Sequence, residues 1–296
     1  MPIPGPEERA RIDTAELIES EIKSFTLNSP LNHLPTPENN IIFDEPLVQF
    51  ADGDDPIFTE YKNIIHSTHF TPREAFARAY NKNPEDMPSR FSVVSWILPI
   101  TSKTRESNRR RKKTPSRDWV HTRWYGEKVN EATREHMVNF LTKKGFLAVA
   151  PLLQPYFKIT EPGEDNNYYS NWSERHIAYS AGLGTFSLSD GFITERGIAH
   201  RCGSIVTNLE LPASPRTAKN PYANCLYYVN GKCQACINRC PAGAITENGH
   251  DKIKCGDYLS TKLHRLSERY GVRRWGCGFC QTRVPCESIN PVRKLK

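Results

Sequence analysis

All nine cysteines of this 296-residue chain lie between positions 202 and 286, and eight of them fall into two spaced groups. The first group comprises Cys225, Cys233, Cys236 and Cys240, with Pro241 directly after the last. The second comprises Cys255, Cys277, Cys280 and Cys286. Four thiolates that converge on one point can hold a 4Fe-4S cubane, and a CxxCxxxCP run is typical of chains that hold two. The spacing therefore predicts two iron–sulfur clusters and one-electron chemistry.

The assignment of thiols to clusters follows from the way such runs cross. In two-cluster ferredoxins, the Cys beside Pro in one run ligates the cluster of the other run. We therefore assign the first cluster to Cys225, Cys233, Cys236 and Cys286. We assign the second cluster to Cys240, Cys255, Cys277 and Cys280. Two features depart from the ferredoxin pattern: the gap between Cys225 and Cys233 is long, and the last thiol is Cys286, because Val284 occupies the usual position before Pro285.

Zinc and disulfides are the alternative interpretations of these cysteines. Zinc also binds CxxC pairs, but zinc ribbons rarely contain CxxxCP. Disulfides require an oxidising compartment, and the sequence has no mark of export. Cys202 lies outside both groups, and we interpret it as a small buried hydrophobic residue rather than as a ligand or a nucleophile.

Composition places the chain among globular proteins. Hydrophobic residues make up 38% of it and aromatic residues 10%, which is enough for a substantial core. It contains no apolar run of about 18 residues, so we expect no transmembrane helix and no membrane partner. The N-terminus lacks the apolar stretch of a secretory signal and the twin-arginine motif. We therefore expect a cytoplasmic protein.

Net charge is +7, and five consecutive basic residues run from Arg109 to Lys113. Such a run is either a solvated loop or an electrostatic footprint for RNA or for an acidic electron donor. We favour the solvated loop, because no aromatic residues for base stacking are interleaved with the charges.

The elements that must position the thiols alternate between helices and strands. Helices are predicted from Asp13 to Phe25, from Thr71 to about Asn81, from about Tyr125 to Lys143, and from Asn171 or Ser173 to Ala181. Strands are predicted at 91–100, 146–153 and 203–211. We interpret residues 1–12 as a loose arm, 28–57 as long connections and 104–118 as a basic loop. The alternation predicts an α/β (α+β) core rather than a helical bundle.

A glycine-rich segment precedes the cysteines. By itself, Ala181-Gly182-Leu183-Gly184 indicates either a helix C-terminal turn or backbone that approaches a flat or phosphorylated cofactor. The surrounding sequence is more specific: ERHIAYSAGLG (174–184), then Ile193-Thr194, Gly197 and Gly203-Ser204, and then the two-cluster run. Together these residues resemble the epoxyqueuosine reductase and reductive dehalogenase superfamily, and most closely its short, soluble epoxyqueuosine-reductase-like members.

The resemblance implies a nitroreductase-like core that binds a base-off cobalamin, followed by a bacterial-ferredoxin-like domain with two 4Fe-4S clusters. We expect an N-terminal arm and helix at 1–44, the core at 45–215 and the ferredoxin-like domain at 216–296. A low-potential donor such as ferredoxin or flavodoxin would supply electrons for reductive elimination on a small-molecule substrate. By the resemblance, the residues at the corrinoid are Trp172, Arg175, His176, Gly182, Leu183, Gly184, Gly203 and Ser204. Trp172 and Arg175 could instead brace the helix, and His176 could be structural.

Reductive elimination also needs a proton donor. Epoxyqueuosine reductases place an Asp shortly before the Glu-Arg pair, whereas reductive dehalogenases use a Tyr. The corresponding position before Glu174-Arg175 is Tyr168, our first candidate for the acid, with Tyr169 second and Asp165 the nearest upstream carboxylate. This change, together with Ser187 where that enzyme often has Lys, leads us to expect that tRNA is an unlikely partner.

Three functions remain open from the sequence. The first is a cobalamin-dependent reductase with an unknown substrate. The second is an iron–sulfur electron-transfer protein without a corrinoid. The third is an epoxyqueuosine reductase that acts on tRNA.

Overall fold

A four-stranded antiparallel sheet forms the centre of the computed structural model, which describes residues 6–160 and 167–295. The strand order is β1-β2-β8-β3, with β1 at Leu47–Asp52, β2 at Ser92–Pro99, β3 at Ala148–Val149 and β8 at His200–Thr207. The two central strands pair along their whole length, from Ser92 opposite Thr207 to Pro99 opposite His200. Every residue of β2 is buried, because helices cover both faces of the sheet.

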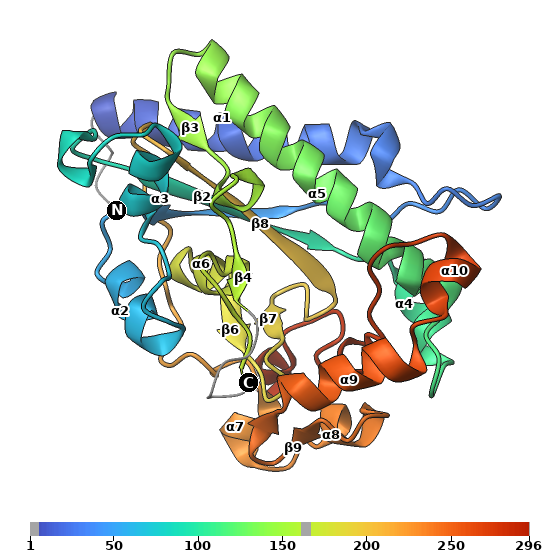
Figure 1. The fold of residues 1–296 in the computed structure, drawn as a ribbon. Helices are drawn as coiled ribbons and strands as arrows, with labels where there is room; N and C mark the ends of the chain where they lie inside the picture. The colour runs from blue at the N-terminus through green and yellow to red at the C-terminus, as the bar shows by residue number, and fades with distance from the viewer. Residues whose placement is uncertain (1–5, 161–166, 296) are drawn as a thin grey trace.

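Side chains of β2 alternate between two cores. Trp96 and its even-numbered neighbours belong to one core with α1 (Pro6–Asn28) and α5 (Arg117–Lys143). Val93 and Ile97 belong to the other, with α2 (Ile57–Ile64), α3 (Pro72–Ala79) and α6 (Glu174–Ser180). Figure 1 shows α1 and α5 crossing one face of the sheet, and α2 and α6 on the other. The expected mixed α/β fold is confirmed, with antiparallel pairing throughout this sheet.

Several predicted elements match the structure and others differ from it. The helix predicted at Thr71 is α3. The Thr71 side chain accepts from the Glu74 backbone N–H, and the Glu74 side chain accepts from the Thr71 backbone N–H, which together form a capping box. The predictions of β2 and β8 are also confirmed. Of the strand predicted at 146–153, only the two residues of β3 pair with the sheet, because Pro151 begins a short 3-10 turn.

Three regions expected to lack structure contain elements. The helix α1 begins at Pro6 rather than after a loose arm, and Ile18 and Ile22 pack it against the sheet. The edge strand β1 lies in the stretch expected to be only connections, and α4 (Ser102–Arg109) lies in the expected basic loop. In α4 only Thr104 and Asn108 are buried, so hydrophobic periodicity does not reveal this helix. The helix α5 also begins earlier than predicted, at Arg117, where Ser116 caps it.

The cysteine-bearing segment, 216–296, packs below the sheet in Figure 1. It contains short helices α7 (Leu226–Asn230), α8 (Ala235–Arg239), α9 (Lys252–Lys262) and α10 (Leu266–Tyr270), and a hairpin of β9 (Ile245–Thr246) and β10 (Gly249–His250). Between it and the sheet lie two further two-stranded pairs, β4 (Ile159–Thr160) with β5 (Tyr169–Ser170), and β6 (Gly184–Phe186) with β7 (Phe192–Thr194). The 3-10 turns are Pro30–Asn32, Pro84–Asp86, Pro151–Leu153, Phe279–Gln281 and Pro291–Leu295.

The contacts that join this segment to the core include backbone hydrogen bonds and an apolar cluster. The backbone N–H groups of Ile198 and Ala199, just before β8, donate to the carbonyls of Cys286 and Glu287. Apolar residues of α10 and the following loop pack against Val120 of α5. None of the helices within the described ranges combines the length and the apolar character needed to cross a bilayer.

The packing around Gly203 gives a first test. A Cβ there would lie 2.4 Å from two ring atoms of Trp96 and 2.5 Å from Asn130 Oδ1, which accepts the Trp96 indole N–H. We expect Gly203→Ala to lower the unfolding free energy by about 1–3 kcal/mol through overpacking. Gly276→Ala is the control, because nothing lies within 4 Å of its Cβ position. Chemical denaturation measures both, and equal stabilities would contradict the packing argument.

Candidate functional site

The first predicted set of thiols faces one small cavity. Cys225, Cys233, Cys236 and Cys286 all line it, and so does Cys280 of the second set. Desolvation, followed by the neighbouring thiols of Cys225, Cys236 and Cys233, raises the pKa of Cys286 well above its ordinary value. The structure thus brings together the four cysteines that the sequence grouped, although Cys225 and Cys286 are far apart in the chain.

The second predicted set also forms one neighbourhood. Desolvation raises the pKa of Cys255 to about 11, with Cys277 and Cys240 as the next causes. The pKa of Cys280 is raised by desolvation and then by Cys277, Cys255, Cys236 and Cys240. Cys280 therefore lies among its own set and beside Cys236 of the first set, so the two sets adjoin.

These donors suit iron–sulfur clusters in chemistry and in spacing. All nine cysteines are free, and the two sets offer only sulfur, the ligand of iron–sulfur centres. Within residues 6–160 and 167–295, no three His, Cys, Asp or Glu side chains are close enough to bind a single metal ion. Each set is a looser grouping of thiols, with Cys236 of the first set in α8 and Cys255 of the second set in α9.

A buried carboxylate fixes the last thiol. Glu287 follows Cys286 and is 4% exposed. It accepts from the Arg283 backbone N–H at 2.6 Å and pairs with Arg109 Nη2 at 2.7 Å and with Arg105 Nε at 3.3 Å. The helix α4 therefore anchors the Cys286 loop. Local sequence pattern cannot reveal this contact, because Arg109 and Glu287 lie 178 positions apart.

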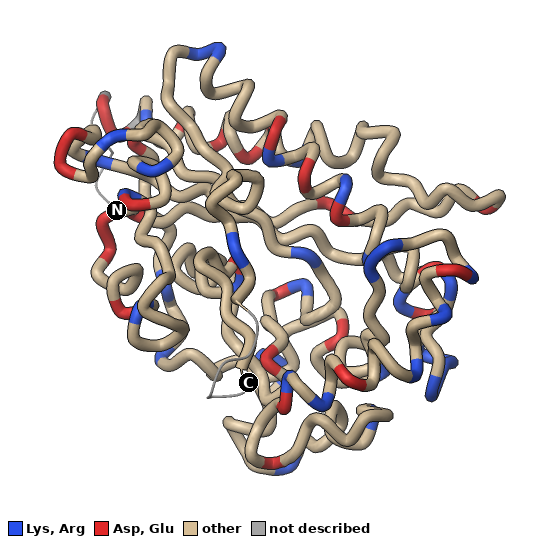
Figure 2. The backbone as a smooth tube through the Cα atoms, in the orientation of Figure 1, with Lys and Arg blue, Asp and Glu red and all other residues tan. Residues whose placement is uncertain are grey.

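The basic run thus has two parts. Arg109 ends α4 and pairs with Glu287, whereas Arg110 to Lys113 are exposed. Figure 2 shows Lys and Arg gathered at the end of the molecule that carries α4 and α10, beside the cysteine-bearing segment. The solvated loop expected at 104–118 is confirmed for Arg110–Lys113 alone.

The start of α6 is held by a buried polar network. Glu174 accepts from Ser204 Oγ at 2.6 Å and pairs with Arg134 Nη2 at 3.0 Å. Trp172, which is 1% exposed, donates its indole N–H to Ser204 Oγ at 3.0 Å. Burial raises the pKa of Glu174, in opposition to the attraction of Arg134. Of the predicted corrinoid residues, Trp172, Gly203 and Ser204 therefore lie in packed interior, where they brace α6 against β8.

The glycine-rich segment lines a large cavity, of about 980 Å³, together with Tyr179, Arg216 and Asn224. A pocket of this volume is at the upper end of the range for small-molecule sites. Gly182 has φ +78°, and a Cβ there would meet the Pro215 carbonyl at 2.7 Å. A Cβ on Gly184 would lie 2.3 Å from the Ile193 carbonyl. The chain's own packing thus requires both glycines, as the helix-terminus interpretation predicts.

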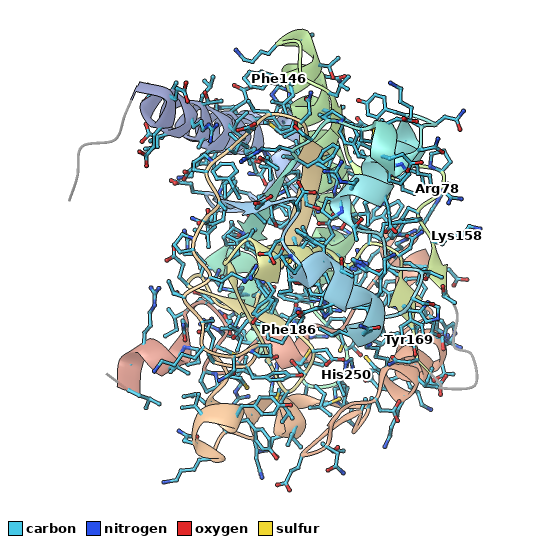
Figure 3. All side chains as sticks on the ribbon, turned by 90° about the vertical axis from the view of Figure 1, so that its left-hand side faces the viewer. Arg78, Phe146, Lys158, Tyr169, Phe186 and His250 are labelled. Atoms are coloured by element: carbon cyan, nitrogen blue, oxygen red, sulfur yellow. The ribbon has the colours of Figure 1, made fainter. Side chains whose placement is uncertain are left out.

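The proton-donor candidates occupy different environments. Tyr168 is 42% exposed, and its hydroxyl lies 3.9 Å from the Cβ position of Gly256, which follows Cys255 in α9. Tyr169 stacks on His66, with ring centroids 4.7 Å apart. In Figure 3, Tyr169 and His250 lie in the half of the molecule next to the cysteine-bearing segment, and Phe146 lies at the opposite end. Asp165 is outside the described residues.

The residues after Glu174 also face the cysteine-bearing segment. The Arg175 guanidinium donates to the Asp190 carbonyl, and the Asp190 carboxylate lies 3.4 Å from His250 Nδ1 of β10. Desolvation, followed by the charge of Arg175, lowers the pKa of His176 to about 3. Its Nδ1 bonds to Ser173 Oγ at 2.8 Å, so His176 is a neutral side chain with a structural partner.

Cys202 has a partner in the same strand. His200 Nε2 bonds to the Phe192 carbonyl at 2.7 Å, which leaves Nδ1 as the acceptor for the Cys202 thiol at 3.7 Å. Desolvation, and then the charge of Glu174, raises the pKa of Cys202 to about 12. A thiol that stays protonated is a poor nucleophile and metal ligand, which supports the structural interpretation of Cys202.

Buried neutral histidines predict how stability depends on pH. Desolvation lowers the pKa of His69 and of His200 to about 4, from an ordinary value of 6.5. The unfolded chain therefore binds more protons between those values, so stability present above pH 6.5 is lost as pH falls towards 4. His69 Nε2 accepts from the Ser173 N–H, and Gln can replace this acceptor.

We expect His69→Gln to reduce the slope of unfolding free energy against pH in this window by up to about 1.4 kcal/mol per pH unit. Urea denaturation at intervals from pH 4 to 7 measures the slope. His264→Gln, at an exposed position, is the control for the substitution itself. An unchanged slope in His69→Gln would show that His69 titrates normally.

Comparison with known proteins places this site in context. No protein-family model matches the chain. The curated epoxyqueuosine reductase of Francisella cf. novicida is 34% identical over 130 residues, which are 42% of this chain and 34% of that enzyme. The Bacillus cereus enzyme is 33% identical over 119 residues, which are 38% of this chain and 29% of that enzyme. The Escherichia coli enzyme is 28% identical over 166 residues, which are 54% of this chain and 36% of that enzyme. These matches span about a third of each curated relative.

Solved structures match over more of the chain. A crystal structure of selenomethionine-labelled epoxyqueuosine reductase aligns with 93% of this chain and 66% of its own, at 18% identity and a TM-score of 0.50. A crystal structure of epoxyqueuosine reductase with an epoxyqueuosine-modified tRNA-Tyr stem loop aligns over the same shares, at 16% identity and a TM-score of 0.51. The resemblance found in the sequence is thus confirmed, and the chain is related to the epoxyqueuosine reductases in sequence and in fold.

Proposed function

We propose that this chain is an iron–sulfur oxidoreductase of the epoxyqueuosine reductase kind. Its first cluster is held by Cys225, Cys233, Cys236 and Cys286, and its second by Cys240, Cys255, Cys277 and Cys280. The observation that supports this proposal most strongly is the pair of adjoining, desolvated thiol sets, with Cys280 beside both. The second set is the one nearer to Tyr168, because Cys255 precedes Gly256 in α9.

The cofactor that the resemblance implies is a base-off corrinoid, which supplies a strongly reducing cobalt for reductive elimination when it is bound. Of the candidate residues, Leu183 lines the cavity described above and the Arg175 side chain is exposed, so these two would contact such a group. The volume of the cavity at Leu183 fits a large ligand. The glycines do not add to this support, because the chain's own backbone already requires them. In the same proposal, residues 45–215 form a nitroreductase-like core with 1–44 packed on it, and 216–296 form the ferredoxin-like unit.

We propose epoxyqueuosine in tRNA as the substrate, ahead of an unspecified small molecule. The curated relatives reported above are all named for that substrate, and one structural neighbour was solved with a tRNA stem loop. The expectation from the sequence that tRNA is an unlikely partner is therefore set aside. Exposed Arg110–Lys113 provides cationic surface for RNA phosphates. An acidic, low-potential carrier such as ferredoxin or flavodoxin is the proposed electron donor.

Within this function, Tyr168 has the role of acid. Its hydroxyl faces α9, whereas the ring of Tyr169 is stacked on His66. A phenol is a weak acid that carries its proton in neutral water, so a tyrosine hydroxyl can act as a proton donor. The proton passes from the Tyr168 oxygen to the product or leaving group, and solvent returns it.

Iron content tests the cluster assignment. We expect Cys286→Ser to reduce iron from about eight to about four atoms per chain, because one cubane loses a ligand. Cys202→Ser is the matched control, since Cys202 lies outside both sets, and its iron content remains that of the wild type. Iron analysis and EPR of the dithionite-reduced protein, purified without oxygen, measure both variants. Full iron in Cys286→Ser would contradict the assignment.

Turnover tests the reaction. With cobalamin and a low-potential electron donor, we expect the chain to convert epoxyqueuosine in a tRNA stem loop to queuosine. Mass spectrometry of the stem loop measures this conversion. Tyr168→Phe should slow it by roughly 10²–10⁴-fold, the usual contribution of a general acid, with both cofactors retained. Tyr169→Phe is the control. Full clusters without corrinoid binding or turnover would favour the electron-transfer protein instead.

A further inference from the structure

The Glu127 carboxylate lies near three arginine side chains between α5 and β8. Glu127 Oε1 pairs with Arg134 Nη1 at 3.2 Å. Its second oxygen lies 3.9 Å from Arg123 Nη1 and 3.9 Å from Arg201 Nε. A separation of 3.9 Å is too long for a hydrogen bond. Arg134 therefore makes the close contact with Glu127. Arg123 and Arg201 are attracted to the same carboxylate but form no hydrogen bond with it.

Among residues 6–160 and 167–295, no carboxylate other than Glu127 lies within ion-pair distance of Arg123 or Arg201. Glu174 is occupied by Arg134 and by Ser204 Oγ. The Arg201 Nη2 donates to the Arg123 carbonyl at 3.2 Å, which holds the two guanidinium-bearing residues together. Arg123 Nη1 is a buried donor without a hydrogen-bond partner among the described residues. A buried donor left unpaired costs free energy that a bound acceptor recovers.

The charges around this pair are unbalanced. The charge of Arg201, and then desolvation and Arg274, lower the pKa of Arg123 to about 9 in opposition to Glu127. Desolvation lowers the pKa of Arg201, and Arg134 and Arg274 act in the same direction. Four guanidinium groups thus act on a region that holds three carboxylates, those of Glu127, Glu131 and Glu174. The excess is cationic, which is unfavourable away from water unless an anion is present.

The two arginines remain reachable. The Arg123 and Arg201 side chains are 31% and 21% exposed, whereas Arg134 is 1% exposed. Desolvation combined with partial exposure indicates a recess rather than a convex surface. Arg274 contributes from the loop after α10, three residues before Cys277. The recess therefore lies between the core and the cysteine-bearing segment.

We propose that Arg123 and Arg201, with Arg274, form a binding site for a phosphate group. Phosphate offers acceptor oxygens for the unpaired Arg123 donor and negative charge for the cationic excess, and arginine forks bind it in bidentate fashion. The group can come from inorganic phosphate or from a phosphodiester in a larger ligand. This proposal is independent of the proposed reduction, because it concerns only which anion the recess accepts.

The test uses the full-length chain, purified without oxygen, and inorganic phosphate as the probe. Phosphate should raise the melting temperature by mass action, more than potassium chloride does at equal ionic strength. Titration calorimetry should show binding that weakens by roughly 10- to 100-fold in Arg201→Gln or Arg123→Gln, the usual effect of losing a charged hydrogen-bond donor. Arg90→Gln, at an exposed arginine far from Glu127, is the matched control.

Stability without phosphate separates a binding role from a structural one. Removing one of two repelling cations should leave the phosphate-free melting temperature of Arg123→Gln equal to or above that of the wild type. A fall in that temperature, with the phosphate response retained, would overturn the proposal. No phosphate response in the wild-type chain would also overturn it.

Competition then identifies the source of the group. Displacement of phosphate by cobalamin but not by cobinamide, which lacks the phosphodiester, would place a corrinoid phosphate in the recess. Displacement by a short RNA stem loop would place an RNA phosphate there. Displacement by neither leaves inorganic phosphate as the ligand.

Discussion

The buried guanidinium of Arg134 joins the parts of this fold that matter for its chemistry. It projects from α5, pairs with Glu174 at the start of α6, and donates to the Cys202 carbonyl in β8. A guanidinium that is 1% exposed is stable only when its charge is paired, so these three elements must keep their relative positions. The start of α6, Trp172 and the glycine-rich turn after the helix all depend on this arrangement.

Much of the fold was accessible from local sequence, and the failures have a common cause. β2 was predicted because its eight residues are apolar or small, and α3 because Thr71 and Glu74 form a local capping box. Local sequence does not reveal β1, because its pairing partner is β2, 40 to 50 residues away in the sequence. α4 was missed because its stability comes from Asn108 and Arg109, which bond to residues beyond position 276. Long-range contacts leave no periodic pattern in the segment that makes them.

The same distinction between local patterns and long-range contacts applies to the candidate site. The grouping of thiols could be predicted because cysteine spacing is a local property of each run, and the structure brings the two groups together as expected. The arginines around Glu127 could not be predicted, because Arg123, Arg201 and Arg274 come from three separate elements. The glycine-rich segment had two interpretations from the sequence. Its contacts with Pro215 and Ile193 account for the glycines through packing alone.

The backbone bonds from Ile198 and Ala199 to Cys286 and Glu287 have a thermodynamic consequence. The sheet and α4 together hold the Cys286 loop through contacts that need no iron. Ordering this loop is therefore part of folding rather than part of metal binding, and Cys286 of the first thiol set is preorganised. Preorganisation of ligands raises affinity because less conformational entropy is lost on binding. The departure at Cys286 from the usual ferredoxin spacing is thus compensated by a rigid support from the neighbouring core.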